Sequence, residues 1–225
     1  MVMQSMSNNI TLYGAGGHCK VVVDILQTLG YSIKRIVDDN PLSQSLLNIP
    51  MTYPEGEFGF TIITIGNCQM RKKIVDRITV KKYVTAIHPS AIIAPNVFIG
   101  EGCMIIHGAI IQSCSSIGRH CIINTKAVVE HDSVIHDFVH IAPGAIVCGG
   151  VEIGECTWLG AGSVVKQGIK IGSNCMIGAG SVVVKDIPDN VVAYGNPCRV
   201  IKQNNNIKIL SLIHISEPTR HSLIS

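Results

Sequence analysis

The sequence predicts two parts of different fold class: a small α/β, Rossmann-like domain over residues 1–83, and an all-β parallel solenoid of hexapeptide repeats over residues 84–202. Two patterns lead to this prediction: an unbroken six-residue repeat of aliphatic residues in the second part, and a strand, Gly-rich turn, helix, strand order in the first. The composition agrees, because 47% of the residues are hydrophobic but only 4% are aromatic. An aliphatic core with few rings favours thin, regular β-structure.

The repeat begins at Ile87, and every sixth residue from there to Val183 is Ile, Val or Leu. These three residue types make up 68 of the 225 residues, so seventeen in succession are not expected by chance. Three hexads, each a short strand and a corner, would close a coil of 18 residues with the aliphatic position inside. The fifth position is small or β-branched throughout and fits the remaining inner space. Glycines recur at the second position, where we expect the corner to need a backbone conformation open to glycine: Gly100, Gly118, Gly154, Gly160, Gly172 and Gly178.

The first part of the chain has the order of a nucleotide-binding βαβ unit. Strands are predicted at 10–13, 33–37 and 60–65, a Gly-rich turn at 14–17, and helices at 20–29 and 69–78. The amides of such a turn and the helix N-terminus can bind a phosphate or a sugar edge, and Asp38 or Asp39 can accept bonds from ribose hydroxyls or a base. Cys19 replaces the third glycine of the dinucleotide fingerprint, so a tight turn without a ligand stays an alternative.

The solenoid carries two candidate sites. His131 lies at a predicted corner beside Asp132, and a carboxylate neighbour suits an imidazole that acts as a general base near neutral pH. A merely solvated histidine is the alternative. His140 follows half a coil later, and Ala161 and Ala179 recur one coil apart at another corner. Exposed backbone beside such small side chains can bind a long, narrow ligand, although small residues are also what a tight corner requires.

Six motifs, taken together in chain order, are more specific: Gly-Ala-Gly-Gly-His, Val-Asp-Asp, Ile-Gly-Asn-Cys-Gln-Met-Arg-Lys-Lys, Asn-Thr-Lys-Ala-Val-Val-Glu-His-Asp, Phe-Val-His-Ile-Ala-Pro-Gly and Gly-Asn-Pro-Cys-Arg-Val-Ile-Lys. The hexapeptide run resembles the left-handed β-helix acyltransferases. The whole set is similar to bacterial sugar acetyltransferases of the sialic-acid O-acetyltransferase and nucleotide-amino-sugar N-acetyltransferase type. The resemblance covers about residues 10–202, with Cys198 in place of the usual Ala, a change expected to affect packing only.

The resemblance implies a left-handed parallel β-helix and a homotrimer with acetyl-CoA, the co-substrate, in the groove between neighbouring β-helices. It implies that His131 is the general base and that Asp132 raises its basicity. It further implies that His140 and the backbone at Ala161 and Ala179 contact acetyl-CoA. The residues it assigns to nucleotide-sugar binding are Gly16, Gly17, His18, Asp38, Asp39 and Gly66.

The reaction expected from the resemblance is N-acetylation of the 4-amino group of a UDP- or GDP-linked amino sugar in bacterial surface glycan biosynthesis. O-acetylation of sialic acid or another sugar is the alternative within the family. Two rivals lie outside it. A zinc hydratase of the γ-carbonic anhydrase type would use His131 and His136, but Pro95 stands where its third histidine is needed. The other rival is a non-catalytic nucleotide-sugar-binding protein.

Charge and cysteine content bear on partners and location. The formal net charge is only +3, which does not indicate nucleic-acid binding. Neither a signal peptide nor a membrane-spanning stretch is visible, and the nine cysteines are an odd number, so we expect a cytoplasmic protein with reduced thiols. Cys103, Cys121 and Cys175 fall at the small inward position and are interpreted as small hydrophobes, and no metal is expected. Residues 203–225 match no hexad and are interpreted as a non-native tail.

Overall fold

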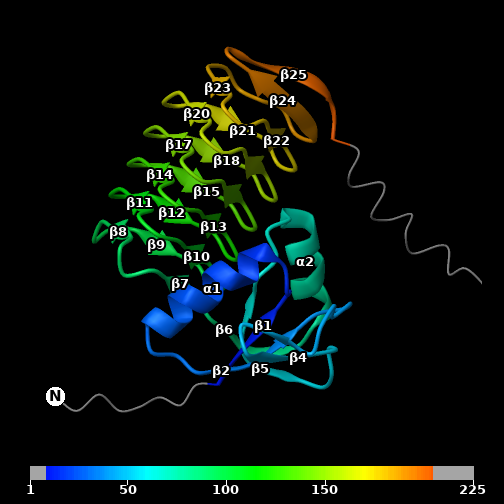
Figure 1. The fold of residues 1–225 in the computed structure, drawn as a ribbon. Helices are drawn as coiled ribbons and strands as arrows, with labels where there is room; N and C mark the ends of the chain where they lie inside the picture. The colour runs from blue at the N-terminus through cyan, green and yellow to red at the C-terminus, as the bar shows by residue number, and fades with distance from the viewer. Residues whose placement is uncertain (1–8, 205–225) are drawn as a thin grey trace, which may run out of the picture.

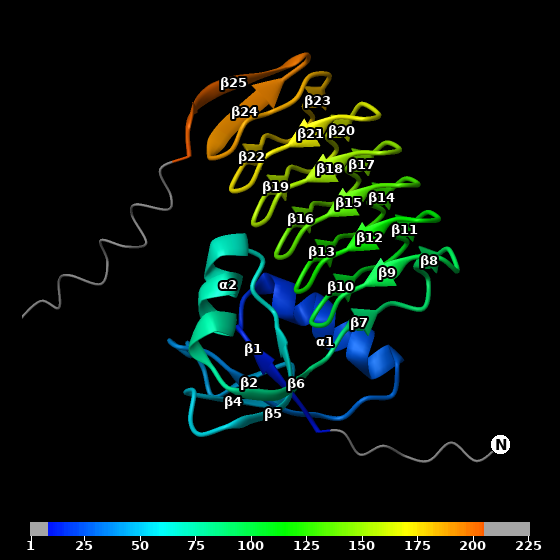
Figure 2. The same cartoon turned by 180° about the vertical axis from the view of Figure 1, so that it is seen from behind.

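The computed structural model describes residues 9–204 and shows an α/β domain packed against one face of a long β-helix (Figures 1 and 2). Strand β6 of the α/β domain ends at Tyr83, and the first strand of the β-helix, β7, begins at Ala86. Of the segment expected to be a non-native tail, only Gln203 and Asn204 are described, and 205–225 lies outside the described residues.

The α/β domain is a six-stranded sheet in the order β3-β4-β2-β1-β5-β6, parallel except for the β3–β4 hairpin. Its elements are β1 (Ile10–Tyr13), α1 (Gly17–Thr28), β2 (Ile33–Val37), β3 (Ser45–Leu46), β4 (Ile49–Thr52), β5 (Phe58–Ile63), α2 (Cys68–Arg77) and β6 (Val80–Tyr83). The expected strands and helices are present within a few residues, whereas the hairpin and β6 were not predicted. Helix α1 begins earlier than expected because Gly16, in an extended conformation, already serves as its N-cap.

The β-helix consists of three sheets, which we call sheets 1, 2 and 3. Sheet 1 contains β7 (Ala86–Ile87), β10 (Met104–Ile105), β13 (Ile122–Ile123), β16 (His140–Ile141), β19 (Trp158–Leu159), β22 (Met176–Ile177), β24 (Val191–Gly195) and β25 (Cys198–Gln203). Sheet 2 contains β8 (Ile92–Ile93), β11 (Ile110–Ile111), β14 (Val128–Val129), β17 (Ile146–Val147), β20 (Val164–Val165) and β23 (Val182–Val183). Sheet 3 contains β9 (Phe98–Ile99), β12 (Ser116–Ile117), β15 (Val134–Ile135), β18 (Glu152–Ile153) and β21 (Lys170–Ile171).

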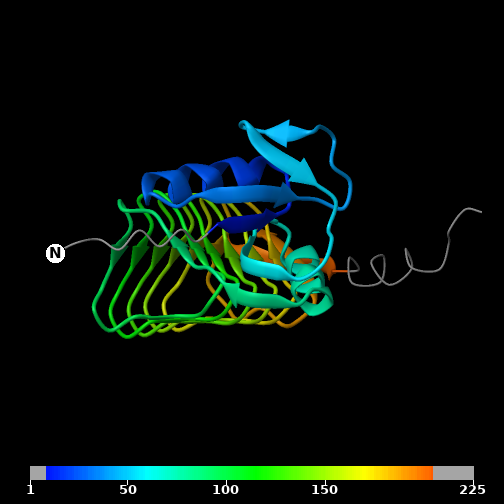
Figure 3. The same cartoon turned by 90° about the horizontal axis from the view of Figure 1, so that it is seen from below.

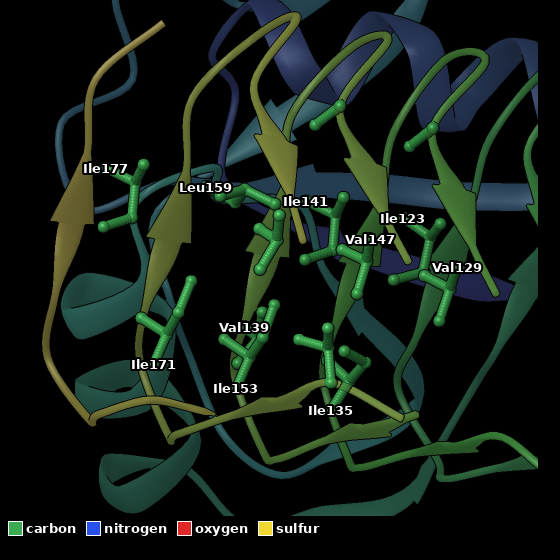
Figure 4. Close-up of a cluster of buried hydrophobic side chains, with 14 of the residues drawn as sticks. Ile123, Val129, Ile135, Val139, Ile141, Val147, Ile153, Leu159, Ile171 and Ile177 are labelled. Atoms are coloured by element: carbon green, nitrogen blue, oxygen red, sulfur yellow. The ribbon is translucent and has the colours of Figure 1, made fainter. Parts of the chain in front are cut away.

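The register confirms the 18-residue coil. Ile105 pairs in parallel with Ile123, and Ile123 pairs with Ile141. Each residue of a strand therefore lies beside the residue 18 positions earlier in the neighbouring strand. The aliphatic first positions and the small fifth positions form one continuous interior cluster. Figure 4 shows these side chains in rows inside the β-helix. Cys103, Cys121 and Cys175 are buried in this cluster, as their spacing predicted.

The corners correct one expectation about glycine. Every sixth residue from Gly102 to Gly180 has φ between 54° and 71°, which is the fourth position of the hexad and not the second. The second-position glycines are required for a different reason, namely close approach of neighbouring coils. A Cβ on Gly160 would lie 2.6 Å from the carbonyl carbon of Gly178. The fourth position is most often Gly, and it also holds Asp, Asn and His, which tolerate the left-handed region. Cys114, Lys126, Phe138 and Cys156 adopt the same conformation without that tolerance.

The α/β domain covers sheet 1, as Figure 3 shows from below. Apolar residues of α1, among them Val22 and Leu26, pack on the outward-facing Met104 and Ile122 of sheet 1. Helix α2 packs on the edge where sheet 3 turns into sheet 1, with Cys68 against Phe138 and Cys156. The antiparallel β24–β25 pair continues sheet 1 at the far end, where Cys198 is 4% exposed and joins the interior cluster.

Two further observations concern the described residues as a whole. All nine cysteines lie within residues 9–204, and none forms a disulfide. Neither α1 nor α2 has the length and apolar character needed to cross a membrane.

Candidate active site

The loops that follow β1 and β5 meet at the point where the α/β sheet changes direction. Strand β1 lies between β2 and β5, and in open parallel sheets such a switch point opens a crevice at the carboxyl ends of the strands. The Thr64 hydroxyl donates a 2.6 Å hydrogen bond to the Gly14 carbonyl, and a Cβ on Gly14 would lie 2.6 Å from Ile65. The crevice is therefore built by two loops in direct contact, each followed by a helix N-terminus.

Two histidines, the buried His140 and the half-buried His18, lie where this crevice meets sheet 1. His140, at the start of β16, has Nδ1 at 3.0 Å from the Gly66 carbonyl and Nε2 at 3.0 Å from the Asn124 side-chain amide. The His18 ring, in the first turn of α1, lies 6.2 Å from the His140 ring. The structure thus brings His18, Gly66 and His140 together, although the sequence had assigned His140 to acetyl-CoA and the other two to the nucleotide-sugar.

Burial sets the charge state of both imidazoles. Loss of solvation, together with the nearby Arg71 charge, lowers the pKa of His140 to about 3 and that of His18 to about 4. Both rings are therefore neutral at physiological pH, so His140 Nδ1 can donate to Gly66 while Nε2 accepts from Asn124. The Nε2 atom of His18 is buried and has no hydrogen-bond partner within residues 9–204.

A cavity of about 650 Å³ lies beside these histidines, between the N-terminus of α2 and the outer face of sheet 1. Its walls include Gly66, Asn67, His140, Trp158 and Met176. Trp158 is 39% exposed and presents an aromatic surface to the cavity, whose lining is mostly apolar and also contains Asn67 at the N-terminus of α2. This combination of a helix N-terminus and an aromatic wall suits a ligand with both a phosphate and a ring.

The two aspartates after β2 already have protein partners. Asp38 accepts hydrogen bonds from the backbone N–H groups of Ala15 (2.7 Å) and Asn40 (2.9 Å), so it fixes the Gly-rich turn. Asp39 accepts a hydrogen bond from the Tyr13 hydroxyl at 2.7 Å and is paired with Arg77. Burial and the bond to Asp39 raise the pKa of Tyr13 to about 12, so the phenol stays protonated.

Arg71 is the main residue of the crevice that the sequence did not reveal. It is fully buried and donates to the carbonyls of Ile65 (2.7 Å), His120 (2.8 Å) and Phe138 (2.7 Å). These bonds join the loop after β5 to two successive corners of the β-helix. Three consecutive basic residues on a helix are usually a solvated face, and only the tertiary structure shows that the first of them is enclosed.

His131 lies in a different part of the molecule, on the edge where sheet 2 turns into sheet 3. This edge is opposite sheet 1, because the three sheets form a triangle. His131 Nδ1 is 2.7 Å from Asp132 Oδ2, and both side chains are about two-thirds exposed, at 64% and 65%. The next coil places Gly149 directly against the ring, and a Cβ there would lie 2.6 Å from His131 Cε1. The imidazole is thus oriented by a carboxylate and open to solvent.

Ala161 and Ala179 lie one coil apart on the third edge, where sheet 1 turns into sheet 2. Both are exposed, and the Ala161 carbonyl accepts a hydrogen bond from the Gly180 N–H at 2.8 Å. Within residues 9–204 the N–H groups of both alanines have no acceptor. The predicted site residues therefore form three separate groups on one chain: the crevice at sheet 1, the edge with Ala161, and the edge with His131.

Comparisons with known proteins identify this arrangement. Residues 9–78 match the PglD N-terminal domain, and residues 150–185 match the bacterial transferase hexapeptide repeats. The fold is similar to perosamine N-acetyltransferase from Caulobacter crescentus, crystallised as a histidine variant with CoA and GDP-perosamine. Identity is 35%, coverage is 87% of this chain and 98% of the other, and the TM-score is 0.82. This chain belongs to the bacterial sugar acetyltransferase family. It is accordingly a hexapeptide-repeat acyltransferase with a left-handed β-helix.

Other relatives in the family support the assignment. The acetyltransferase domain of PglB from Neisseria gonorrhoeae, in complex with acetyl coenzyme A, is 32% identical over 85% of this chain and 98% of its own, with a TM-score of 0.77. UDP-N-acetylbacillosamine N-acetyltransferase from Bacillus subtilis strain 168 is 37% identical over 113 residues. That alignment covers 44% of this chain and 51% of the relative, and another curated relative is covered to only 22%.

Proposed function

We propose that the chain is a cytoplasmic enzyme that transfers the acetyl group of acetyl-CoA to the 4-amino group of a nucleotide-linked amino sugar. Relatives whose names state such reactions, on GDP-perosamine or a UDP-linked bacillosamine precursor, support this proposal. The observation on this chain that carries it is the crevice between the N-terminus of α2 and the outer face of sheet 1, which is lined by Gly66, His140 and Trp158. The His18 ring lies 6.2 Å from the His140 ring.

The crevice has the chemistry that a nucleotide-linked sugar needs. Free N–H groups at a helix N-terminus attract a phosphate, and the exposed Gly16 and Gly17 open the start of α1 to a ligand. The His18 Nε2 atom is buried next to this surface and lacks a partner in the described residues. Asp38 fixes the Gly-rich turn through its hydrogen bonds to the backbone N–H groups of Ala15 and Asn40. The Asp39 carboxylate can accept further hydrogen bonds from a ribose or a base.

His131 is assigned as the general base. The neutral sugar amine attacks the thioester carbonyl of acetyl-CoA and forms the new C–N bond, the tetrahedral intermediate expels CoA as the thiolate, and the proton lost by nitrogen passes to His131. The imidazolium is stabilised by Asp132 at 2.7 Å and then protonates the thiolate. A covalent acyl-enzyme is not needed, because amine and thioester react directly.

The complete site requires a second copy of the chain. His131 lies on the edge opposite the sheet that carries the crevice, so a sugar bound in the crevice of one chain is separated from that chain's own base by the β-helix. A neighbouring β-helix that presents its His131 edge to the crevice solves this problem. If each chain presents its His131 edge to the crevice of the next chain, three chains close into the expected homotrimer. Acetyl-CoA would then lie between neighbouring chains, where the N–H groups of Ala161 and Ala179 are available to bind it.

Complementation between inactive chains tests this shared site. His131→Ala chains lack the base, and Gly66→Trp chains have the crevice filled, so each homo-oligomer should be inactive. Unfolding and refolding the two together should restore part of the activity, because mixed oligomers contain some sites with an intact crevice from one chain and an intact base from another. Mixtures that stay as inactive as the separate variants would show that base and crevice must lie on one chain.

The acceptor is tested by CoA thiol release. The full-length protein is assayed with acetyl-CoA and a panel of UDP- and GDP-4-amino sugars, the matching 4-hydroxy sugars and free sialic acid. Turnover with one class of 4-amino sugar alone supports the proposal and identifies the nucleotide. Turnover only with hydroxyl acceptors would establish O-acetylation instead.

A further inference from the structure

A cluster of three possible metal ligands lies outside the site described above, where α1 meets the first two coils of the β-helix. Asp24 comes from α1, His88 follows β7, and His107 lies in the next corner along the same edge. One donor atom from each residue lies within 4.8 Å of the other two, and this is the only such group among residues 9–204. The catalytic proposal does not use any of these residues.

The three side chains already lie close together. The His107 Nε2 atom is 2.9 Å from Asp24 Oδ2. The His88 and His107 rings stack with their centres 3.7 Å apart and their planes 26° apart. Bonds of about 2.0–2.1 Å from one ion to two imidazole nitrogens and a carboxylate oxygen would require the two stacked rings to open, so that both in-plane lone pairs reach the same point.

A neighbouring hydroxyl can fix the orientation of His88. The Ser90 Oγ atom is 2.7 Å from His88 Nδ1 and also accepts the N–H of Gly108 at 3.0 Å. The Ser90 backbone N–H donates to the same Nδ1 atom at 3.1 Å, so ion binding through Nε2 would exchange this bond for the tautomer in which Nδ1 is protonated and donates to Ser90 Oγ. Metal-binding histidines generally have such a partner on the other ring nitrogen. Ser90 thus joins His88 to the next coil at Gly108, the residue after His107.

The donor set defines the kind of ion. Two imidazoles and one carboxylate suit Zn²⁺ and related transition-metal ions, whereas Mg²⁺ and Ca²⁺ prefer oxygen ligands alone. We propose that Asp24, His88 and His107 form a Zn²⁺-type divalent metal site that fastens α1 to the first two coils of the β-helix. Because Asp24 belongs to the α/β domain and both histidines to the β-helix, a bound ion would join the two domains away from the catalytic groups.

Zinc affinity of the full-length protein tests the proposal. Protein freed of metal with a chelator is titrated with Zn²⁺ in competition with a chromogenic zinc chelator. We expect one site that is lost or weakened by about tenfold or more in His107→Ala and in Asp24→Asn. His136→Ala is the matched control, because His136 is also exposed and also faces a carboxylate, that of Glu152, but lies outside the cluster. An excess of Mg²⁺ should not compete.

Two further readouts separate this site from the nine thiols and from a purely structural role. Co²⁺ in place of Zn²⁺ should give the weak visible bands of nitrogen and oxygen ligation, without a thiolate charge-transfer band. Zn²⁺ should raise the Tm of the unsubstituted chain and of His136→Ala but not that of His107→Ala. Failure of the unsubstituted chain to bind Zn²⁺, equal binding by His107→Ala and Asp24→Asn, or thiolate bands with Co²⁺ would each overturn the proposal.

Discussion

The crevice at sheet 1 and the His131 edge place histidines in opposite surroundings. His18 and His140 are enclosed, and burial together with Arg71 lowers the pKa of His140 to about 3 and that of His18 to about 4. His131 is 64% exposed and has a carboxylate at 2.7 Å. The first pair can offer neutral hydrogen-bonding atoms of fixed geometry, whereas the exposed residue can exchange a proton with a substrate and then with water. The difference suggests that this fold assigns recognition to buried imidazoles and proton transfer to exposed ones.

The largest expected effect comes from removing the exposed imidazole. His131→Ala should lower kcat about 10²–10⁴-fold, because a general base typically contributes that much. The Kd for the nucleotide-sugar, measured by calorimetry without acetyl-CoA, should change little, because the crevice binds the nucleotide and the neighbouring chain's base acts only on the sugar amine. Full turnover by this variant would remove His131 from the mechanism, and lost sugar binding would show that His131 serves to hold the sugar and not only as a base.

The buried imidazoles should appear in the pH dependence of stability. The pKa values of His18 and His120 are lowered to about 4 and that of His140 to about 3, mainly by burial, while the unfolded chain protonates near the ordinary value of 6.5. Below about pH 6.5 the unfolded state therefore binds more protons than the folded state, and the free energy of unfolding falls as the pH drops towards 4. Each histidine contributes up to about 1.4 kcal/mol per pH unit over that range.

The variant His120→Asn tests how much one buried histidine contributes to the pH dependence of the free energy of unfolding. His120 is suitable because it lies outside the ligand-binding surface of the crevice. Position 120 has φ of 55°, which Asn tolerates, and the His120 Nδ1 atom is buried without a partner in the described residues. Urea unfolding between pH 4.5 and 7 should show a slope reduced by about one proton relative to the unsubstituted chain. An unchanged slope would mean that His120 is protonated in the folded state.

The repeat made most of the β-helix predictable, because period six places each residue on a known side of a known coil. Ile123, for example, is interior in the sequence pattern and in the structure. The expectation that second-position glycines such as Gly160 adopt an unusual backbone conformation was wrong. The sequence does not show which corner residue has a positive φ and which one approaches the next coil closely. The β3–β4 and β24–β25 pairs follow no period, so nothing in the spacing marks them.

The site was predictable where its residues are neighbours in sequence. His131 and Asp132 are adjacent, so their hydrogen bond could be expected directly. Arg71 reaches carbonyls 49 and 67 residues away, and Asn124 reaches His140 only because one coil brings them together. Such contacts depend on how α2 docks on the β-helix, which no local pattern encodes. The position of His140 beside Gly66 was missed for the same reason.

A smaller effect should come from the residue that makes room for the base. Gly149→Ala needs no unusual backbone conformation, but its Cβ would lie 2.6 Å from the His131 ring and must displace it. We expect kcat to fall by about tenfold to a hundredfold with KM for the sugar nearly unchanged, because the ring moves by an ångström or more. Gly59→Ala, exposed and with open space around its Cβ position, is the matched control and should keep full activity. Equal kcat in both variants would show that the orientation of His131 does not matter.

The smallest effect is expected at the other exposed histidine on this side of the β-helix. His136 lies five residues after His131 and is the second ligand that a zinc hydratase would need. In the structure its Nε2 atom is 3.2 Å from the Glu152 carboxylate, whereas His131 is hydrogen-bonded to Asp132. Because the two rings are held by different carboxylates, His136→Ala should leave kcat for acetyl transfer within about twofold, as expected for an exposed surface pair. The same variant should leave CO₂ hydration at background, as in the unsubstituted chain. A loss of acetyl transfer comparable to that of His131→Ala would place both histidines in one catalytic site. The His131 edge would then contain two catalytic groups and not one.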